Sequence, residues 1–335
     1  MKNFLIVGAG GFIAGHIVNR LLTGGCKVTA VDIKPLEFWF QKFDKAQNYN
    51  LDMSDYINCE KMTKNVDYVL NLACNMGGIG FIENNKAECM LSVLINTHLL
   101  KACLKNKVKK YFFSSSACAY NTDLQKDSNI QGLKEEDAYP AMPEDGYGWE
   151  KLFSERMCRH FYEDYGLETR VARFHNIYGP LGTFDGGREK APAALCRKII
   201  EAKMNKKKDI DVWGNGEQTR SFLFIDDCVE AIFQLFDSSF RDPINIGSDE
   251  KVSINQLINI IEEIAGVKLK INYQLDKPIG VNGRSSDNTL IKKVLGWEYK
   301  YSLKKGISET YKWIEHTMLT KKNNDFLKFT KFELI

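Results

Sequence analysis

The sequence has no long uninterrupted hydrophobic run. None of its apolar stretches approaches the roughly 20 residues that a membrane-spanning helix needs. The N-terminus also lacks a charged leader with a cleavage site, because residues 4–7 already have the apolar composition of a strand. We therefore expect a cytoplasmic protein with no membrane partner.

The sequence also lacks paired cysteines. Its nine cysteines are scattered between Cys26 and Cys228, and none belongs to a Cys-x-x-Cys motif. An odd number in this arrangement does not suit a disulfide scaffold or a zinc site, so we predict no metal site. Most of these thiols should be small buried hydrophobes, the usual fate of free cysteine.

The charge balance has little excess of either sign. Lysine and arginine number 46 against 43 aspartates and glutamates, which gives a net charge of +3 and no reason to expect a nucleic-acid partner. The 335 residues are 44% hydrophobic and 27% charged. A chain of this length can bury a large core, as one large domain or two merged ones.

Glycine is concentrated near the N-terminus. The apolar run at residues 4–7 leads directly into a glycine turn, and helical periodicity follows through Leu22. Glycines at such a turn let backbone N–H groups and the positive end of a helix approach a pyrophosphate. Taken alone, an ordinary turn of an α/β protein is an equal alternative. The predicted cofactor contacts here are Gly8, Gly10, Gly11, Phe12 and Ile13.

Three further positions suggest a dinucleotide. A second strand, residues 27–31, ends in Asp32, whose carboxylate could accept hydrogen bonds from a ribose and would repel a 2′-phosphate. We therefore expect NAD rather than NADP, although Lys34 leaves NADP open. Asp52 could face the adenine, or could be the N-cap of a helix that begins at Met53. Leu72, in the apolar strand 67–73, is a further predicted contact.

Strands and helices then alternate through the first half of the chain. Strands are expected at 110–114 and 168–174, and helices at 83–104 and 147–165. Six such rounds predict an α/β fold with a Rossmann-type doubly wound parallel sheet. We assign residues 1–180 to an NAD-binding domain to which 224–247 returns, 181–320 mainly to a smaller C-terminal substrate-binding region, and 321–335 to a tail.

Tyr147 and Lys151 share one face of the predicted helix 147–165 because they are four residues apart. A phenol is a poor base at neutral pH, but a neighbouring ammonium favours the phenolate, so the pair could take a proton from an alcohol. Together with the glycine turn and Asp32, this pair predicts a nicotinamide-dependent oxidoreductase fold.

The motifs of this chain resemble those of the extended short-chain dehydrogenase/reductase superfamily over nearly its whole length. Within that superfamily they are most similar to the GDP-mannose 3,5-epimerase family. The glycine turn and the Tyr147/Lys151 pair are general to the superfamily. The more discriminating segments are SSACAY at 115–120, RFHNIYGP at 173–180 and GGREKAPAA at 186–194.

This resemblance implies a reaction. Ser116 would hold a sugar hydroxyl, Tyr147 would take its proton, and Lys151 would lower the pKa of that tyrosine and hold the nicotinamide ribose. NAD would take hydride from C4, and the resulting ketone would make the hydrogens on C3 and C5 acidic. Cys118 and Lys190 would then be the acid and base that invert those carbons, converting GDP-mannose to GDP-L-galactose.

The resemblance also implies binding residues and a homodimer formed through long helices. Arg284, Arg220 and Lys198 would face the GDP diphosphate, for which guanidinium groups are suited. The other residues implied to contact the sugar or nucleotide are Gly77, Ser115, Asn176, Glu189, Ala191, Gln218 and Thr219. His175 is expected to be structural. The sequence departs from the family pattern at Cys74-Asn75, Gly146 and Asn282, which leaves the substrate less certain than the chemistry.

Two other functions are compatible with the sequence. The first keeps the fold but changes the outcome: an epimerase of another GDP-sugar or GDP-heptose, a 4-epimerase, or a GDP-sugar C4 dehydrogenase. The second is a non-catalytic NAD-binding regulator. The presence of Ser116, Cys118, Tyr147, Lys151 and Lys190 together argues against the regulator.

Overall fold

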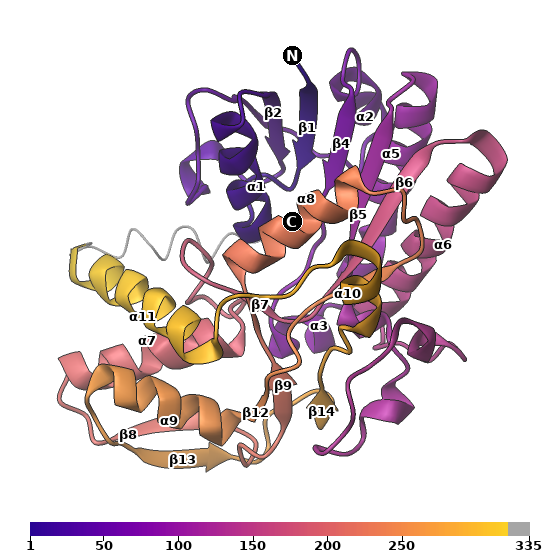
Figure 1. Cartoon of the computed structure of the whole chain (residues 1–335). Helices are drawn as coiled ribbons and strands as arrows, with labels where there is room; N and C mark the ends of the chain where they lie inside the picture. Colours follow the sequence, from indigo (N-terminus) through magenta and orange to yellow (C-terminus); the bar gives the residue numbers. More distant parts are fainter. Residues whose placement is uncertain (321–335) are drawn as a thin grey trace.

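The chain is organised around a seven-stranded parallel sheet with strand order β3-β2-β1-β4-β5-β6-β11 (Figure 1). The computed structural model describes residues 1–320, so the predicted tail at 321–335 lies outside the described residues. The predicted α/β fold with a Rossmann-type sheet is confirmed. The strands are β1 Asn3–Val7, β2 Lys27–Asp32, β3 Gln47–Asn50, β4 Tyr68–Asn71, β5 Lys110–Ser116, β6 Glu168–Phe174 and β11 Ile244–Ile246.

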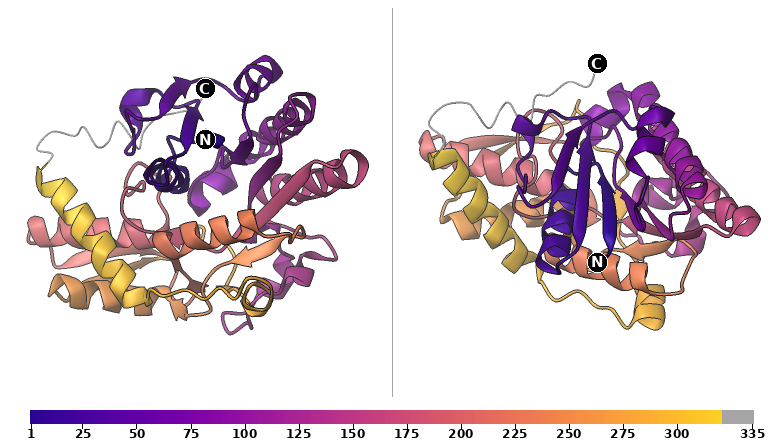
Figure 2. Two further views of the ribbon diagram at one scale, coloured as in Figure 1. Left: turned by 45° about the horizontal axis from the view of Figure 1, so that its top comes forward. Right: turned by 90° about the horizontal axis from the view of Figure 1, so that it is seen from above.

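Helices cover both faces of this sheet (Figure 2). Alternate residues of a strand point to opposite faces, so Phe4 and Ile6 of β1 join one core while Leu5 and Val7 join the other. The first core packs against α1 Phe12–Thr23 and α8 Ile225–Asp237. The second packs against α2 Tyr56–Met62, α5 Val93–Lys105 and α6 Tyr147–Tyr165. A sheet buried on both faces explains why its central strands β1 and β4 are almost continuously apolar.

The topology brings several loops to one edge of the sheet. The strand order reverses between β1 and β4, and ligands of open α/β sheets bind outside the carboxyl ends of the strands at such a reversal. The glycine turn follows β1, the loop at 72–78 follows β4, and the short 3₁₀ turn Ala117–Ala119 follows β5. The residues expected to carry chemistry therefore meet at this edge.

The predicted helix at 83–104 is wrong as a single element. The structure has three helices there: α3 Ile79–Asn84, α4 Lys86–Leu91 and α5 Val93–Lys105. Asn84 and Asn85 donate side-chain hydrogen bonds to the backbone carbonyls of Gly80 and Phe81, which compete with continuation of the helix. The chain breaks again at Ser92, whose hydroxyl accepts a hydrogen bond from the backbone of Asn75.

The alternative role of Asp52 as a helix N-cap is also wrong. Helix α2 begins at Tyr56, and its N-cap is Asp55, whose carboxylate accepts a hydrogen bond from the backbone N–H of Ile57 at 2.8 Å. Asp52 is exposed and instead accepts from the backbone N–H of Ser54. Asp52 and Asp55 were both possible N-caps of this helix, and the helix uses Asp55.

A smaller region lies beside the carboxyl edge of the sheet, at the lower left of Figure 1. Its helices α7 Ala191–Met204, α9 Ile254–Ala265 and α11 Leu303–Thr320 pack on one another. Strands β8 Asp209–Trp213 and β13 Lys270–Gln274 form one parallel pair, and β12 Lys251–Ser253, β9 Thr219–Ser221 and β14 Gly283–Arg284 form a small sheet. The remaining elements are β7 Ile177–Tyr178, β10 Leu223–Phe224 and α10 Thr289–Leu295.

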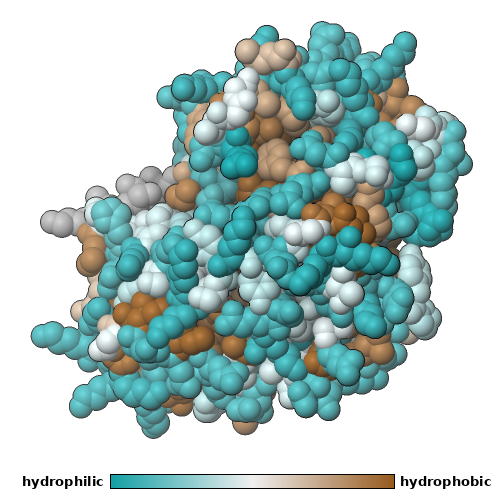
Figure 3. Space-filling view, in the orientation of Figure 1, coloured by the Kyte–Doolittle hydropathy of each residue, from teal (hydrophilic) through white to brown (hydrophobic). Residues whose placement is uncertain are grey.

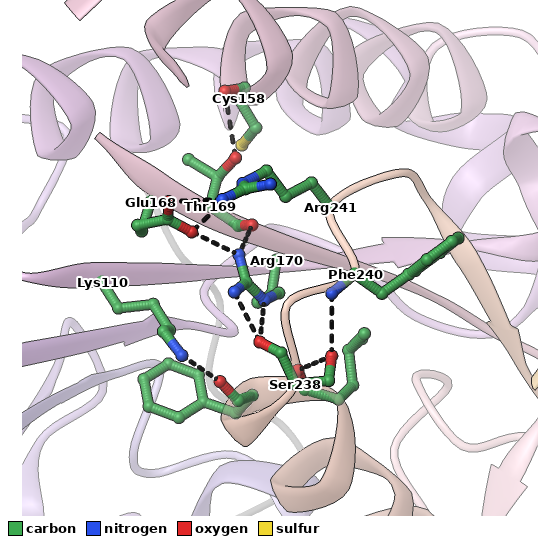
Figure 4. Close-up of polar contacts among 10 residues, drawn as sticks. Lys110, Cys158, Glu168, Thr169, Arg170, Ser238, Phe240 and Arg241 are labelled. Carbon is green, nitrogen blue, oxygen red and sulfur yellow. Dashed lines mark hydrogen bonds and ion pairs between the residues drawn. The ribbon is translucent and has the colours of Figure 1, made fainter. Parts of the chain in front are cut away.

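Polar side chains connect the amino end of β6 to the segment after α8 (Figure 4). The guanidinium of Arg170 donates to the carbonyl oxygen of Ser238 and pairs with the carboxylate of Glu168 at 3.0 Å. Lys110 of β5 donates to the carbonyl oxygen of Phe236 at 2.6 Å. These bonds satisfy carbonyl groups at the end of α8 and fix the helix across the sheet.

The face seen in Figure 3 is mainly hydrophilic with scattered apolar patches.

A buried ion pair holds α6 against the sheet. Arg173 of β6 makes two hydrogen bonds, at 2.9 and 2.7 Å, to the carboxylate of Glu155 on α6, and both side chains are at most 3% exposed. Ser115 donates to the same carboxylate, and Arg173 also donates to the carbonyl oxygen of Glu135. Both carboxylate oxygens of Glu155 and all three guanidinium nitrogens of Arg173 therefore have hydrogen-bond partners.

Replacing one partner should destabilise the protein strongly. Arg173→Met should lower the free energy of unfolding by about 3–5 kcal/mol, because it leaves the Glu155 carboxylate buried without a counter-charge. Urea unfolding followed by circular dichroism measures this change. The matched control is Arg159→Met on α6, whose exposed pair with Glu163 should contribute only about 0–1 kcal/mol. Equal losses in the two variants would contradict the importance assigned to the buried pair.

Candidate functional site

The glycine turn after β1 is packed too tightly for a side chain. Gly8 has a φ of +83°, and a Cβ there would lie 2.8 Å from the backbone nitrogen of Ala73. The N–H groups of Gly8 and Ala9 donate to the carbonyl oxygen of Val31, which joins the turn to the end of β2. Gly11, Phe12 and the rest of the turn then open helix α1. The turn thus has the geometry that a pyrophosphate requires.

Asp32 faces this turn. Its carboxylate accepts hydrogen bonds from the backbone N–H groups of Gly10 at 2.9 Å and Lys34 at 2.8 Å. The Lys34 ammonium donates to the carbonyl oxygen of Gly10 at 3.1 Å, so both side chains border the same backbone. An acidic group beside the glycine turn fits the ribose of NAD. Leu72 lies next to the turn, where its N–H donates to Val7, whereas Asp52 is exposed beyond β3.

The N-terminus of α6 touches the backbone of the Cys118 turn. A Cβ at Gly148 would lie 2.3 Å from the carbonyl oxygen of Cys118, so only glycine permits this approach. The close contact places Tyr147 next to Ser116, near enough for the serine hydroxyl to lower the pKa of the phenol. Tyr147, Cys118 and Cys74 belong to one small buried cluster. The structure therefore brings the predicted tyrosine and the predicted cysteine together.

Electrostatics keep Tyr147 protonated and Lys151 charged. Burial, together with the nearby Cys74 and Cys118 thiols, raises the pKa of Tyr147 well above its usual range, and the hydrogen bond with Ser116 acts in the opposite direction. Burial opposes the charge on Lys151, but Cys74 and Glu150 outweigh it, so its pKa is raised. The Lys151 ammonium lies 5.2 Å from the centre of the Tyr147 ring. Deprotonation of Tyr147 thus relies on these two neighbours, Ser116 and Lys151.

Lys151 retains hydrogen-bonding capacity. It is completely buried, and its ammonium forms an ion pair with Glu150 at 3.0 Å but makes no hydrogen bond of good geometry within the described residues. A buried ammonium in this state needs acceptors. Ribose hydroxyl groups are such acceptors, so Lys151, the glycine turn and Asp32 fit a nicotinamide dinucleotide.

Ser115 and Ser116 point to opposite sides of β5. The Ser116 hydroxyl accepts a hydrogen bond from the backbone N–H of Cys118 and faces Tyr147. The Ser115 hydroxyl, in contrast, is buried and donates to Glu155. The alternation of a strand thus divides the two adjacent serines between the chemical site and the support of α6.

The thiol of Cys118 is surrounded by charged groups. It is 8% exposed, and Arg284 donates to its sulfur at 3.5 Å. Burial and the nearby Glu144 raise its pKa to about 11, against the opposing effect of Arg284. Cys118 is therefore a thiol rather than a thiolate at neutral pH, poised to give a proton.

The pKa of Lys190 is shifted in the opposite direction to that of Cys118. Lys190 is the N-cap of α7, and burial lowers its pKa; its titratable neighbours include Cys118, Cys74 and Arg284. A lowered pKa makes the neutral amine, which is the basic form, more accessible near neutral pH. Cys118 and Lys190 lie close enough to influence each other although 72 positions separate them in the sequence. The site thus holds one acid and one base.

Arg220 and Arg284 are neighbours on the parallel strands β9 and β14. Arg220 donates to three backbone carbonyls, those of Thr219, Ile279 and Val281. Burial and the charge of Arg284 lower its pKa to about 10. A guanidinium in this state favours a bound anion. Lys198 is not part of this cluster, since it donates to the carbonyl oxygen of Asp211 and its charged neighbours are Arg197, Asp211, Glu189 and Glu201.

The other predicted binding residues make their own contacts in the structure. Gly77 packs against Phe81 and the backbone of Arg188. Asn176, with a φ of +46°, donates to the carbonyl oxygen of Ser221. Gln218 is buried and its side-chain oxygen has no partner among the described residues, while the Thr219 hydroxyl donates to Ser128. Glu189 accepts from the backbone of Gly187, and Ala191 begins α7.

Four residues of the site had no signal in the sequence. Arg188 stacks its guanidinium 3.9 Å from the centre of the Phe81 ring and donates to Asn75, so it joins two loops. Arg197 pairs with Asp185, Glu189 and Glu201 and donates to Phe184, which holds the loop before Lys190. The other two are Glu144 and Gln125, which both contact Arg284. Each acts through tertiary contacts that no local pattern encodes.

His175 has a structural environment. It is completely buried, its ring bonds to the side chain of Asn245, and burial lowers its pKa to about 3. The ring is therefore neutral throughout the physiological range. Within residues 1–320, no group of three or more histidine, cysteine, aspartate or glutamate side chains could hold a metal ion.

Comparisons with known proteins agree with this geometry. Residues 4–247 match the NAD dependent epimerase/dehydratase family. The chain therefore belongs to this family, and it is an NAD-dependent enzyme.

Two plant enzymes are close relatives. The chain is 47% identical to GDP-mannose 3,5-epimerase 1 of Oryza sativa subsp. indica over 311 residues, which cover 92% of this chain and 81% of that protein. It is 46% identical, with the same coverage, to the GDP-mannose 3,5-epimerase of Arabidopsis thaliana. Among solved structures, UDP-glucose 4-epimerase of Thermotoga maritima with UDP-glucose is similar, with a TM-score of 0.85 and 26% identity over 95% of this chain and 100% of that one.

The choice of cofactor can be tested at Asp32. Asp32→Asn should weaken NAD binding roughly 10-fold or more, because a charged acceptor for the ribose hydroxyls is lost. The variant should also have a smaller preference for NAD over NADP, because the carboxylate that repels the 2′-phosphate of NADP is removed. Titration calorimetry with both dinucleotides measures the two affinities. Unchanged NAD affinity would show that Asp32 serves the glycine turn alone.

Proposed function

We propose that the protein is a GDP-mannose 3,5-epimerase that converts GDP-mannose to GDP-L-galactose with no net oxidation. The observation that carries this proposal is the gathering of Cys118 and Lys190 around Tyr147 and Lys151. A site for alcohol oxidation alone needs only the last two. The names of the plant relatives support the same substrate.

The reaction begins at the C4 hydroxyl of the sugar. Ser116 holds this hydroxyl by a hydrogen bond, and the Tyr147 oxygen takes its proton. The nearby Lys151 ammonium stabilises the phenolate that this requires. The glycine turn, Asp32 and Lys151 would hold NAD, which would supply the acceptor for the C4 hydride and the donor for its return.

The C4 ketone makes the neighbouring C–H bonds acidic. The neutral amine of Lys190 takes a proton from the ring carbon, and the thiol of Cys118 gives one to its other face. Lys190 becomes an ammonium and Cys118 a thiolate, so the proton count of one inversion balances, and proton exchange of both groups with solvent restores them before the second carbon is inverted. Protonation from the opposite face inverts the carbon. The opposite pKa biases of the two groups suit these roles.

The nucleotide is held outside the chemical centre. Arg220, whose described partners are all backbone carbonyls, supplies a cation for the diphosphate. Gln218 lines a surface pocket of about 510 Å³, together with Gly214, Ile279 and Asn282. Pockets of this size accommodate small ligands. We assign the guanosine to this pocket, next to Arg220.

Solvent isotope labelling tests the reaction. Turnover of GDP-mannose in D₂O should introduce deuterium at C3 and C5, measured by mass spectrometry and NMR. Tyr147→Phe should abolish labelling and oxidation together, since the first proton cannot leave. Cys118→Ala should still form the reduced cofactor but should stop inversion.

The outcomes separate the alternatives. Inversion at C4 without label at C3 and C5 would identify a 4-epimerase, and steady accumulation of NADH a dehydrogenase. Normal epimerisation by Cys118→Ala would contradict the division of roles between Tyr147 and Cys118. Tight NAD binding without turnover of any GDP-sugar would favour a regulator.

A homodimer belongs to the same proposal. Helices α4, α5 and α6 expose large apolar side chains in i,i+3 and i,i+4 pairs: Leu91 and Leu94, and Trp149 and Phe153. By length and composition alone the segment Lys86–Lys105 could cross a membrane, but α5 packs on α2 and α6 as part of the sheet layers. We therefore assign its exposed side to a second copy of the chain.

A charged residue on this surface should separate the subunits. Phe153→Glu should produce a monomer in sedimentation velocity, because burying an unpaired carboxylate at an apolar interface costs several kcal/mol. Ile57→Glu, at an exposed apolar residue on α2, is the matched control and should leave the mass unchanged. A monomeric unmodified chain, or a dimer that survives Phe153→Glu, would contradict this interface.

A further inference from the structure

The backbone of Glu144 is fixed against Cys118, and its carboxylate lies near the thiol. Glu144 lies in the loop before α6, and its backbone N–H donates to the carbonyl oxygen of Cys118 at 3.0 Å. Its carboxylate also lies close enough to the Cys118 thiol to raise the pKa of the thiol, and a protonated sulfur can donate a hydrogen bond to it. A carboxylate can accept this bond only while the sulfur carries a proton.

Arg284 completes a buried triad with these two residues. Its guanidinium pairs with the Glu144 carboxylate and donates to the Cys118 sulfur at 3.5 Å. Its Nε donates to the side chain of Gln125 at 2.7 Å, which fixes the plane of the guanidinium. The side chains of Arg284 and Glu144 are only 7% and 14% exposed. The sulfur is therefore held between one acceptor and one donor.

We propose that Glu144 is a positioning residue that aims the Cys118 sulfur and retains its proton, so that Cys118 enters each inversion as the acid. The role of Cys118 as an acid rests on the function proposed above, but the contact with Glu144 does not. A thiolate would face the Glu144 carboxylate across a short distance in a desolvated site, where like charges repel strongly. The thiol avoids this repulsion and can donate a hydrogen bond to the carboxylate.

The balance of charges around Cys118 decides the direction of the effect. Burial and Glu144 raise the pKa of the thiol to about 11, and Arg284 lowers it. The charged or titratable groups that face it come from the loop before α6, from α6, from β9 and β14, and from the start of α7: Glu144, Tyr147, Arg220, Arg284 and Lys190. Removing only the charge of Glu144 leaves the cations in excess, so the thiol pKa must fall.

Alkylation of Cys118 tests the proposal without any sugar substrate. Iodoacetamide reacts with thiolates, so its rate against pH reports the thiol pKa, and peptide mass spectrometry isolates the modification at Cys118. Glu144→Gln should move the midpoint down by at least one pH unit, which corresponds to a roughly 10-fold faster reaction below the midpoint. The matched control is Asp145→Asn, which removes an exposed charge one residue away that pairs with Lys86.

The outcomes are distinct. An unchanged midpoint in Glu144→Gln, or an equal shift in Asp145→Asn, would overturn the proposal. If Glu144→Gln does not fold, Glu144→Asp keeps the charge but shortens the side chain, and a downward shift of smaller size is expected. An unshifted midpoint in a folded Glu144→Asp chain with a nonfolding Glu144→Gln chain would also count against it.

Turnover provides a second reading. With GDP-mannose in D₂O, Glu144→Gln should lower kcat for inversion several-fold at neutral pH with little change in KM, and should leave C4 oxidation intact. The pH profile of labelling should move in the same direction as the alkylation profile. If GDP-mannose is not the substrate, labelling fails in every variant while the alkylation shift remains, so the two proposals fail separately.

Discussion

The buried ion pair between Glu155 and Arg173 is the contact on which the site depends. It joins α6 to β6, and Ser115 adds β5 to the same carboxylate. Tyr147 lies eight positions earlier on this helix, which is roughly 12 Å along its axis. A helix fixed this firmly cannot slide along the sheet, so the position of Tyr147 relative to the end of β5 is set by a bond outside the chemical centre. A buried pair adds little net stability but strongly favours one arrangement over others.

Burial sets the starting protonation states of the reacting groups. It raises the pKa values of Tyr147 and Cys118 and lowers that of Lys190, so all three tend toward their neutral forms. Neutral groups are the least costly to bury. The charges that remain belong to residues that orient these groups, such as Lys151 and Arg284, and each has a nearby carboxylate. Arg220 has none within hydrogen-bonding reach among its described partners, which is consistent with a phosphate at that position.

Local patterns predicted the framework well because local physics determines it. The helix Tyr147–Tyr165 ends at a left-handed Gly166, and the glycine turn follows β1 at the predicted position. The break at Asn85 was not predictable in the same way, because a side-chain amide that bonds back to Phe81 looks like any polar helix residue. The triad around Cys118 could not be predicted from local sequence patterns at all. Arg284 is 166 positions from Cys118, and only the folded chain shows that this arginine also contacts the thiol.

The contact between Gly148 and the carbonyl of Cys118 places the hydride chemistry and the thiol on one rigid body. Lys190 does not belong to it, since it caps a helix of the smaller region. In the proposed reaction, the two faces of the sugar ring are therefore served by side chains from different regions of the chain. A change in the angle between the two regions would move the amine of Lys190 and the guanidinium of Arg284 relative to the sugar, and would leave Tyr147 and Lys151 in place. Substitutions between the two regions could therefore change the proportion of singly and doubly inverted products without touching the cofactor or Cys118.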